Sequence, residues 1–97
     1  MNTNSKKAIL LNKKDNVVTI LSPICKGESI EIVYNGEVVN KLIVLDDVEV
    51  YHKIALVPIE AGEHIYKYGE VIGKATQFIK VGQHVHIHNI ESARRNR

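Results

Sequence analysis

Three histidines alternate in the run Gln83-His84-Val85-His86-Ile87-His88-Asn89. Successive side chains on a β-strand point to opposite faces, so we expect Val85 and Ile87 to face the core and the histidines to share the other face. Neighbouring histidines are then roughly 7 Å apart and the outer two roughly 13 Å apart. Because imidazole binds a divalent ion at about 2.1 Å, one ion can join His84 with His86 or His86 with His88, at most two of the three. The alternative is an ordinary solvent-facing strand.

Two further groups carry side chains that are suited to catalysis or substrate binding. His52-Lys53, before the apolar run 54–59, offers a general base and a cation for a carboxylate, and the pair is also a common strand entrance. Lys67, Tyr68 and Lys74 lie next to small residues that let an anionic ligand approach the backbone. Two turns with exposed lysines are the alternative there. No phosphate-binding, dinucleotide-binding, serine hydrolase or zinc protease motif occurs.

The elements that position these residues are predicted to be strands. The chain contains 13 Ile and 12 Val against 6 Leu and 5 Ala, which favours a mainly β fold. Asn35-Gly36 accepts the positive φ values of a type I′ turn, so residues 29–34 and 37–45 are predicted to form a hairpin. A single short turn of helix is compatible with residues 46–50.

An internal repeat adds recurring corners to this β fold. Residues 23–30 align without gaps to residues 58–65 and to residues 78–85. Each copy has an apolar anchor, a turn containing Gly, and then a strand. Glycine suits such a turn because one position commonly has positive φ. The copies are 35 and 20 residues apart, which favours a compact barrel-like or clip-like sheet over a solenoid of fixed period.

Length, charge and cysteine usage limit the classes of protein. The 97 residues suffice for one domain, which we place at residues 15–92. Residues 1–14 are predicted to form a basic tail or an irregular edge strand, and residues 93–97 a basic tail. The acidic domain between them, with 11 acids against 6 lysines in residues 15–93, argues against nucleic-acid binding. No 18-residue apolar run or signal peptide is present, and the lone Cys25 fits the cytoplasm.

The ordered motifs resemble a known family. An ordered set of six motifs is similar to the small domain of altronate and galactarate dehydratases. The motifs are His52-Lys53-Ile54-Ala55, residues 59–63, Lys67-Tyr68-Gly69, residues 72–75, Gly82 and residues 84–89. That domain belongs to the SAF group, named after antifreeze proteins and the C-terminal domain of sialic acid synthase. The resemblance implies an SAF-type β-clip fold and a lyase that depends on a divalent metal, Fe²⁺ or Mn²⁺. Tyr51 departs from the pattern, because the family commonly has Gly there.

The resemblance also implies a partner. Family members usually join this domain to a larger catalytic domain, whereas sulfolactate sulfo-lyase keeps the two on separate chains. A single β domain of this size rarely encloses the roughly 300 Å³ that a small substrate needs. We therefore expect the small subunit of a two-chain dehydratase for a sugar acid or a related 2-hydroxy acid, with a large catalytic subunit as partner. The alternative is a non-catalytic SAF module that binds a sugar acid or docks onto another protein. Self-association into a homo-oligomer is left open.

Overall fold

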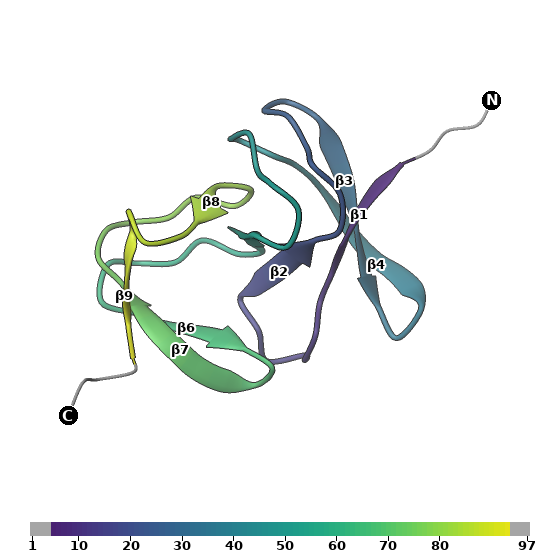
Figure 1. Ribbon diagram of the computed structural model, residues 1–97. Coiled ribbons are helices and arrows are strands. Elements are labelled where there is room, and N and C mark those ends of the chain that lie inside the picture. Colours follow the sequence, from purple (N-terminus) through teal and green to yellow (C-terminus); the bar gives the residue numbers. More distant parts are fainter. Residues whose placement is uncertain (1–4, 94–97) are drawn as a thin grey trace.

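The protein is built from strands, as its Ile and Val content predicts. The computed structural model describes residues 5–93, and every regular element in that range is a β-strand (Figure 1). No helix in this range is long and apolar enough to cross a membrane. The strands are β1 (Lys6–Ile9), β2 (Val17–Ile20), β3 (Ser29–Tyr34), β4 (Glu37–Ile43), β5 (Lys53–Ala55), β6 (His64–Lys67), β7 (Glu70–Ala75), β8 (His84–Val85) and β9 (Ile90–Ser92).

These strands form two open sheets, where the sequence suggested one barrel-like sheet. The larger sheet has the order β4-β3-β1-β2-β5-β8 and the smaller one β6-β7-β9. Strand β1 pairs with β3 in parallel and with β2 antiparallel, so it lies inside the larger sheet. Residues 1–14 were expected to form a tail or an edge strand, whereas residues 6–9 form an interior strand. The fully buried side chain of Ala8 explains this position. Residues 1–4 and 94–97 of the two predicted tails lie outside the described range.

The Asn-Gly hairpin is confirmed. Strands β3 and β4 pair antiparallel from Ser29 opposite Ile43 to Tyr34 opposite Glu37. Asn35 and Gly36 have φ values of 51° and 81°, the positive values that a type I′ turn requires. The short helical turn proposed for residues 46–50 is wrong. Val48 instead forms a β-bridge with Ile24 through two backbone hydrogen bonds of 3.0 and 2.9 Å.

The three copies of the sequence repeat form three equivalent corners. In each corner a side-chain oxygen accepts a hydrogen bond from the backbone N–H three residues earlier, and a glycine follows two residues after that N–H. The bonds join Glu28 to Cys25, Glu63 to Glu60 and Gln83 to Lys80 at 2.7–2.9 Å. The glycines Gly27, Gly62 and Gly82 all have φ near 90°. The repeated motif therefore encodes one local geometry three times.

Two apolar clusters hold the corners and sheets together. The first packs on one face of the larger sheet around residues such as Ile20, Ile32 and Ile54. The second joins the sheets, because Val17, Ala55 and Val85 of the larger sheet pack with Ile65 and Ala75 of the smaller one. Strands β5 and β8 contribute to this second cluster and are fixed on that side by it. They are the strands that carry the candidate site.

Candidate metal centre

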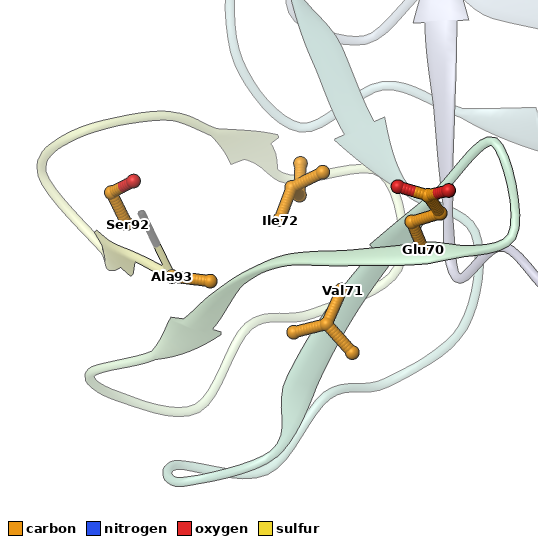
Figure 2. Close-up of a pocket in the computed structure, with 5 residues that line it drawn as sticks. All are labelled: Glu70, Val71, Ile72, Ser92 and Ala93. Atoms are coloured by element: carbon orange, nitrogen blue, oxygen red, sulfur yellow. The ribbon is translucent and has the colours of Figure 1, made fainter. Parts of the chain in front are cut away.

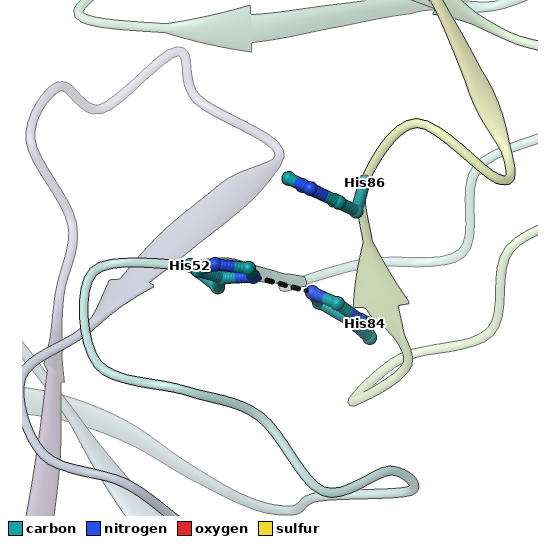
Figure 3. A group of neighbouring side chains, drawn as sticks. All are labelled: His52, His84 and His86. Atoms are coloured by element: carbon teal, nitrogen blue, oxygen red, sulfur yellow. Dashed lines mark hydrogen bonds between the residues drawn. The ribbon is translucent and has the colours of Figure 1, made fainter.

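Three histidines from two distant segments converge at the end of β5 and β8. His52, His84 and His86, hereafter the histidine cluster, each offer a ring nitrogen within 4.8 Å of the other two (Figure 3). His52 Nδ1 and His84 Nε2 are 3.0 Å apart, a hydrogen-bond distance. The ring centres of His52 and His86 are 4.6 Å apart, and the two ring planes are stacked at an angle of 25°. All three side chains are half-buried.

The pairing of β5 with β8 explains why these residues meet. Lys53 lies opposite Val85 and Ile54 lies opposite His84 in an antiparallel ladder. Continuing this register by one residue places His52 opposite His86, on the same face as His84. Hydrogen bonds between the backbones of Ile20 and His52 (2.8 Å) and of Tyr51 and Ile20 (2.7 Å) tie this segment to β2. The cluster is therefore fixed by the sheet itself.

The predicted strand from Gln83 to Asn89 is shorter than expected. Strand β8 ends at Val85, and Ile87, which the alternation placed in the core, is 82% exposed. The fully buried Asn89 causes this change, because its side chain accepts a hydrogen bond from His86 N–H (3.0 Å) and donates one to His84 C=O (2.8 Å). These bonds curl the backbone into a turn after β8. His86, the first residue after β8, stays beside His52, with ring centres 4.6 Å apart. The exposed His88 is not one of the three histidines of the cluster, although its ring centre lies 5.4 Å from that of His84.

Burial and mutual repulsion keep two of these histidines neutral. Burial, and then the charges of neighbours led by His52, lower the pKa of His84 below 6.5. Burial and then His52 and Lys53 likewise lower the pKa of His86. Neutral imidazole is the form that binds a metal or accepts a proton. The cluster is therefore ready for either role at neutral pH.

Two carboxylates that the sequence did not single out face the cluster. Asp46 Oδ2 accepts a hydrogen bond from the backbone N–H of His84 at 2.9 Å. Glu49 Oε1 lies 3.7 Å from His52 Nε2, and its side chain is 85% exposed. His52 N–H also donates to Glu49 C=O at 3.1 Å, which closes the turn that delivers His52. Glu49 could have been recognised as a neighbour of His52 from its position three residues earlier in the sequence. No local sequence feature indicates that Asp46 contacts His84.

The cluster fits a divalent metal ion. Ligand atoms on an ion with bonds of about 2.1 Å stand roughly 3.0–3.5 Å apart, and the separation of 3.0 Å between His52 Nδ1 and His84 Nε2 matches that spacing. His86 completes a set of three imidazole nitrogens, a donor type suited to Zn, Cu, Fe and Ni. Glu49 beside the far nitrogen of His52 resembles the carboxylates that orient metal-bound histidines. The set includes two histidines of the alternating run together with His52, which the sequence suggested as a catalytic residue.

The candidate lysines divide into two groups. Burial, followed by repulsion from the charge of Lys67, lowers the pKa of Lys53. The charge of Lys53 in turn contributes to the lowered pKa of His86. Lys74 lies elsewhere, exposed on β7 between His64 and Glu91, where these three residues line a separate pocket.

Tyr68 lies at the tip of the β6–β7 hairpin. Its side chain is 67% exposed, and Lys67 Nζ lies 5.9 Å from the centre of its ring. The buried carboxylate of Asp15 accepts hydrogen bonds from the N–H groups of Tyr68 (2.9 Å) and Gly69 (2.8 Å). Asp15 therefore anchors the hairpin to the start of β2 and fixes the position of Lys67.

Two surface pockets are lined by residues other than the cluster histidines. A pocket of about 450 Å³ lies between β7 and β9 and is lined by Glu70, Val71, Ile72, Ser92 and Ala93 (Figure 2). A pocket of about 410 Å³ includes Lys6, Cys25 and Glu49. Neither is lined by a histidine of the cluster, and both are open to solvent. The cluster thus lies on a surface that the described chain does not enclose.

Comparison with known proteins agrees with the resemblance in the motifs. The family described as altronate/galactarate dehydratase SAF domain matches residues 6–93. The altronate dehydratase of Bacillus subtilis (strain 168) is 40% identical over 87 residues, which cover 90% of this chain and 16% of that protein. The altronate dehydratase of Escherichia coli (strain K12) is 37% identical over 82 residues, 84% of this chain and 15% of that protein.

A shorter relative has a similar size. The (2R)-sulfolactate sulfo-lyase subunit alpha of Paracoccus pantotrophus is 44% identical over 48 residues, which cover 50% of this chain and 72% of that subunit. The chain therefore spans a small part of the dehydratases and most of the length of the sulfo-lyase subunit. Because the family match extends over both sheets and the whole histidine cluster, the chain belongs to the altronate/galactarate dehydratase SAF domain family.

Proposed function

We propose that the protein is the small subunit of a two-chain, metal-dependent lyase with an SAF-type β-clip fold. The reaction is the removal of water from a sugar acid such as altronate or galactarate, or an elimination from a related 2-hydroxy acid such as sulfolactate. The observation that carries the proposal is the histidine cluster, in which residues 52, 84 and 86 bring three ring nitrogens within 4.8 Å of one another. The names of the relatives supply the substrate classes.

The histidine cluster would hold the metal ion, which we propose to be Fe²⁺ or Mn²⁺. A divalent ion bound there supplies a Lewis acid for the carboxylate and hydroxyl oxygens of the substrate. Three protein ligands leave positions open for these oxygens. Glu49, whose Oε1 lies 3.7 Å from His52 Nε2, and Asp46, which accepts a hydrogen bond from the backbone N–H of His84, would help to hold the ligands before the substrate arrives.

Lys53 and Lys67 are suited to binding the anionic substrate. The reaction removes a proton next to a carboxylate, so negative charge develops on that carboxylate as the proton leaves. A half-buried ammonium such as that of Lys53 stabilises this charge more strongly than an exposed one, because water screens it less. The sequence suggested His52 and Lys53 for the catalytic proton transfer, but a metal-bound His52 keeps no free lone pair, so the base would come from the second chain. Tyr68, next to Lys67, would extend the substrate-binding set, whereas Lys74 lies in a separate pocket and is left out of it.

The remaining groups are proposed to come from a large catalytic subunit. The cluster lies on an open surface, whereas a small-molecule site normally buries most of its ligand. A second chain placed over the cluster would enclose the substrate and supply an acid for the leaving group. We place this assembly in the cytoplasm. A non-catalytic sugar-acid module is the alternative, and it would bind the same acids without turnover in any assembly.

Single substitutions in the cluster test the proposal. His52→Gln, His84→Gln and His86→Gln should each weaken binding of Mn²⁺ to the isolated chain and reduce kcat/KM of the assembled complex at least about a hundredfold. Titration calorimetry and steady-state kinetics measure the two effects. His64→Gln is the matched control, because its side chain is exposed and lies outside the cluster. Full metal content and activity in all three cluster variants would show that the histidines form only a solvent-facing surface.

A further inference from the structure

Two exposed hydrophobic side chains adjoin the histidine cluster. Ile87 is 82% exposed and directly follows His86, and Tyr51 is 72% exposed and directly precedes His52. Among the large hydrophobic residues that the structure describes, these two are the most exposed. Both lie on the turns that deliver a cluster histidine, at residues 49–52 and 86–89. We call Tyr51 and Ile87 the docking pair.

The backbone of Tyr51 indicates that its side chain is not retained for folding. Its φ of 71° lies in the left-handed region, which disfavours residues that carry a β-carbon. The one contact that anchors Tyr51 is its backbone N–H, which donates to Ile20 C=O at 2.7 Å and which glycine would keep. Within residues 5–93 the phenol ring makes no hydrogen bond or ring contact. A strained backbone that carries an exposed aromatic ring beside a reactive site is typical of a functional constraint.

We propose that the docking pair is the contact surface for the larger lyase chain, which closes the histidine cluster from this side. The inference rests on the proposed function, because it takes the second chain from there. A second chain that completes a site on the cluster has to approach it where the three histidines are left half-exposed. Tyr51 and Ile87 are the chain neighbours of His52 and His86, so their backbones lie beside that approach. Tyrosine and isoleucine are suited to insertion into apolar recesses, and buried tyrosines frequently dominate interface energetics.

The carboxylate of Glu49 defines the polar part of the same surface. It lies 3.7 Å from His52 Nε2 and its side chain is 85% exposed. The partner surface should therefore combine an apolar recess for Tyr51 and Ile87 with a basic side chain for Glu49. Such a polar contact at the rim sets orientation more than affinity.

The test is the affinity between this chain and the large chain of the proposed complex, measured by titration calorimetry without substrate. Tyr51→Gly should lower that affinity at least about tenfold while the melting temperature of the isolated chain stays equal or rises. Ile87→Ser should lower the affinity to a similar extent. Binding of Mn²⁺ to the isolated variants should stay unchanged, because neither side chain offers a ligand.

Two matched variants serve as controls. Phe78→Ser also removes an exposed aromatic side chain (46% exposed), and Val39→Ser removes a 51% exposed side chain from β4. Both should bind the large chain within about twofold of the unmodified protein. Affinities of Tyr51→Gly and Ile87→Ser equal to these controls would overturn the inference, while an active complex would leave the proposed function intact. The inference would also be overturned if the unmodified chain self-associates and the same two substitutions abolish this self-association. The docking pair would then contact a second copy of this chain.

Discussion

At the level of single residues, the neutral state of the histidines makes stability depend on pH. The pKa values of His84 and His86 are lowered in the folded chain, mainly by burial. In the unfolded chain both return to about 6.5. At a pH between the pKa of the unfolded chain, about 6.5, and the lower pKa of the folded chain, the unfolded chain binds more protons than the folded chain. The free energy of unfolding must therefore fall as the pH falls through this window and become level below it.

We expect this pH dependence in protein freed of metal by a chelator. Urea unfolding at about pH 7.5, 6.5 and 5.5 should show stability decreasing below pH 6.5. The double variant His84→Gln/His86→Gln should lose most of the decrease, whereas His64→Gln, which removes an exposed histidine of β6, should keep it. An unchanged decrease in the double variant would show that His84 and His86 do not cause it.

At the level of elements, the turn after β8 determines where His86 lies. The buried Asn89 satisfies His86 N–H and His84 C=O, two backbone groups that otherwise lose their partners. Leaving buried polar groups unpaired costs about 1–3 kcal/mol each. The Asn89 amide therefore helps to hold the segment that carries two of the three cluster histidines, together with the backbone N–H groups of Asn89 and Ile90, which donate to His86 C=O at 3.0 and 3.1 Å.

Asn89→Ala tests this role of the turn. The free energy of unfolding should fall by about 2–4 kcal/mol, and the affinity for Mn²⁺ should fall about 10- to 100-fold, although Asn89 is not a ligand. Urea unfolding and calorimetry measure the two effects. Gln77→Ala, which removes an exposed amide, should change neither. A variant that is destabilised but binds Mn²⁺ normally would show that the turn supports the fold without positioning His86.

At the level of the whole molecule, the three histidines of the cluster are only half-buried by residues 5–93. The pockets of about 450 and 410 Å³ are lined by other residues. A reaction that forms an enediolate intermediate needs exclusion of water and groups on both sides of the substrate. A single chain with this shape supplies one side.

The isolated chain should therefore show no turnover of altronate, galactarate or sulfolactate, and addition of the large lyase chain should produce it. The measurement is formation of the 2-keto acid product with each chain alone and with both, at saturating Mn²⁺ or Fe²⁺. Turnover by the purified 97-residue chain alone, at a rate similar to that of the mixture, would contradict the need for a second chain.

Local sequence was sufficient for the parts of the fold that depend on neighbouring residues. The β-branched composition predicted strands, and Asn35-Gly36 predicted the hairpin because its positive φ values are a local requirement. The repeated Gly turns were also visible, since each corner is closed by a bond between residues three positions apart. The ordered motifs identified the family for the same reason.

Tertiary structure alone decided which histidines meet. The strict alternation of residues 83–89 predicted one continuous strand, but the buried side chain of Asn89 ends β8 at Val85 and exposes Ile87. His52 joins His84 across 32 positions because β5 pairs with β8, and that register depends on packing between the two sheets. Spacing along the chain contains no information on such a register. Local chemistry therefore determined the strands and turns, and long-range pairing determined the histidine cluster.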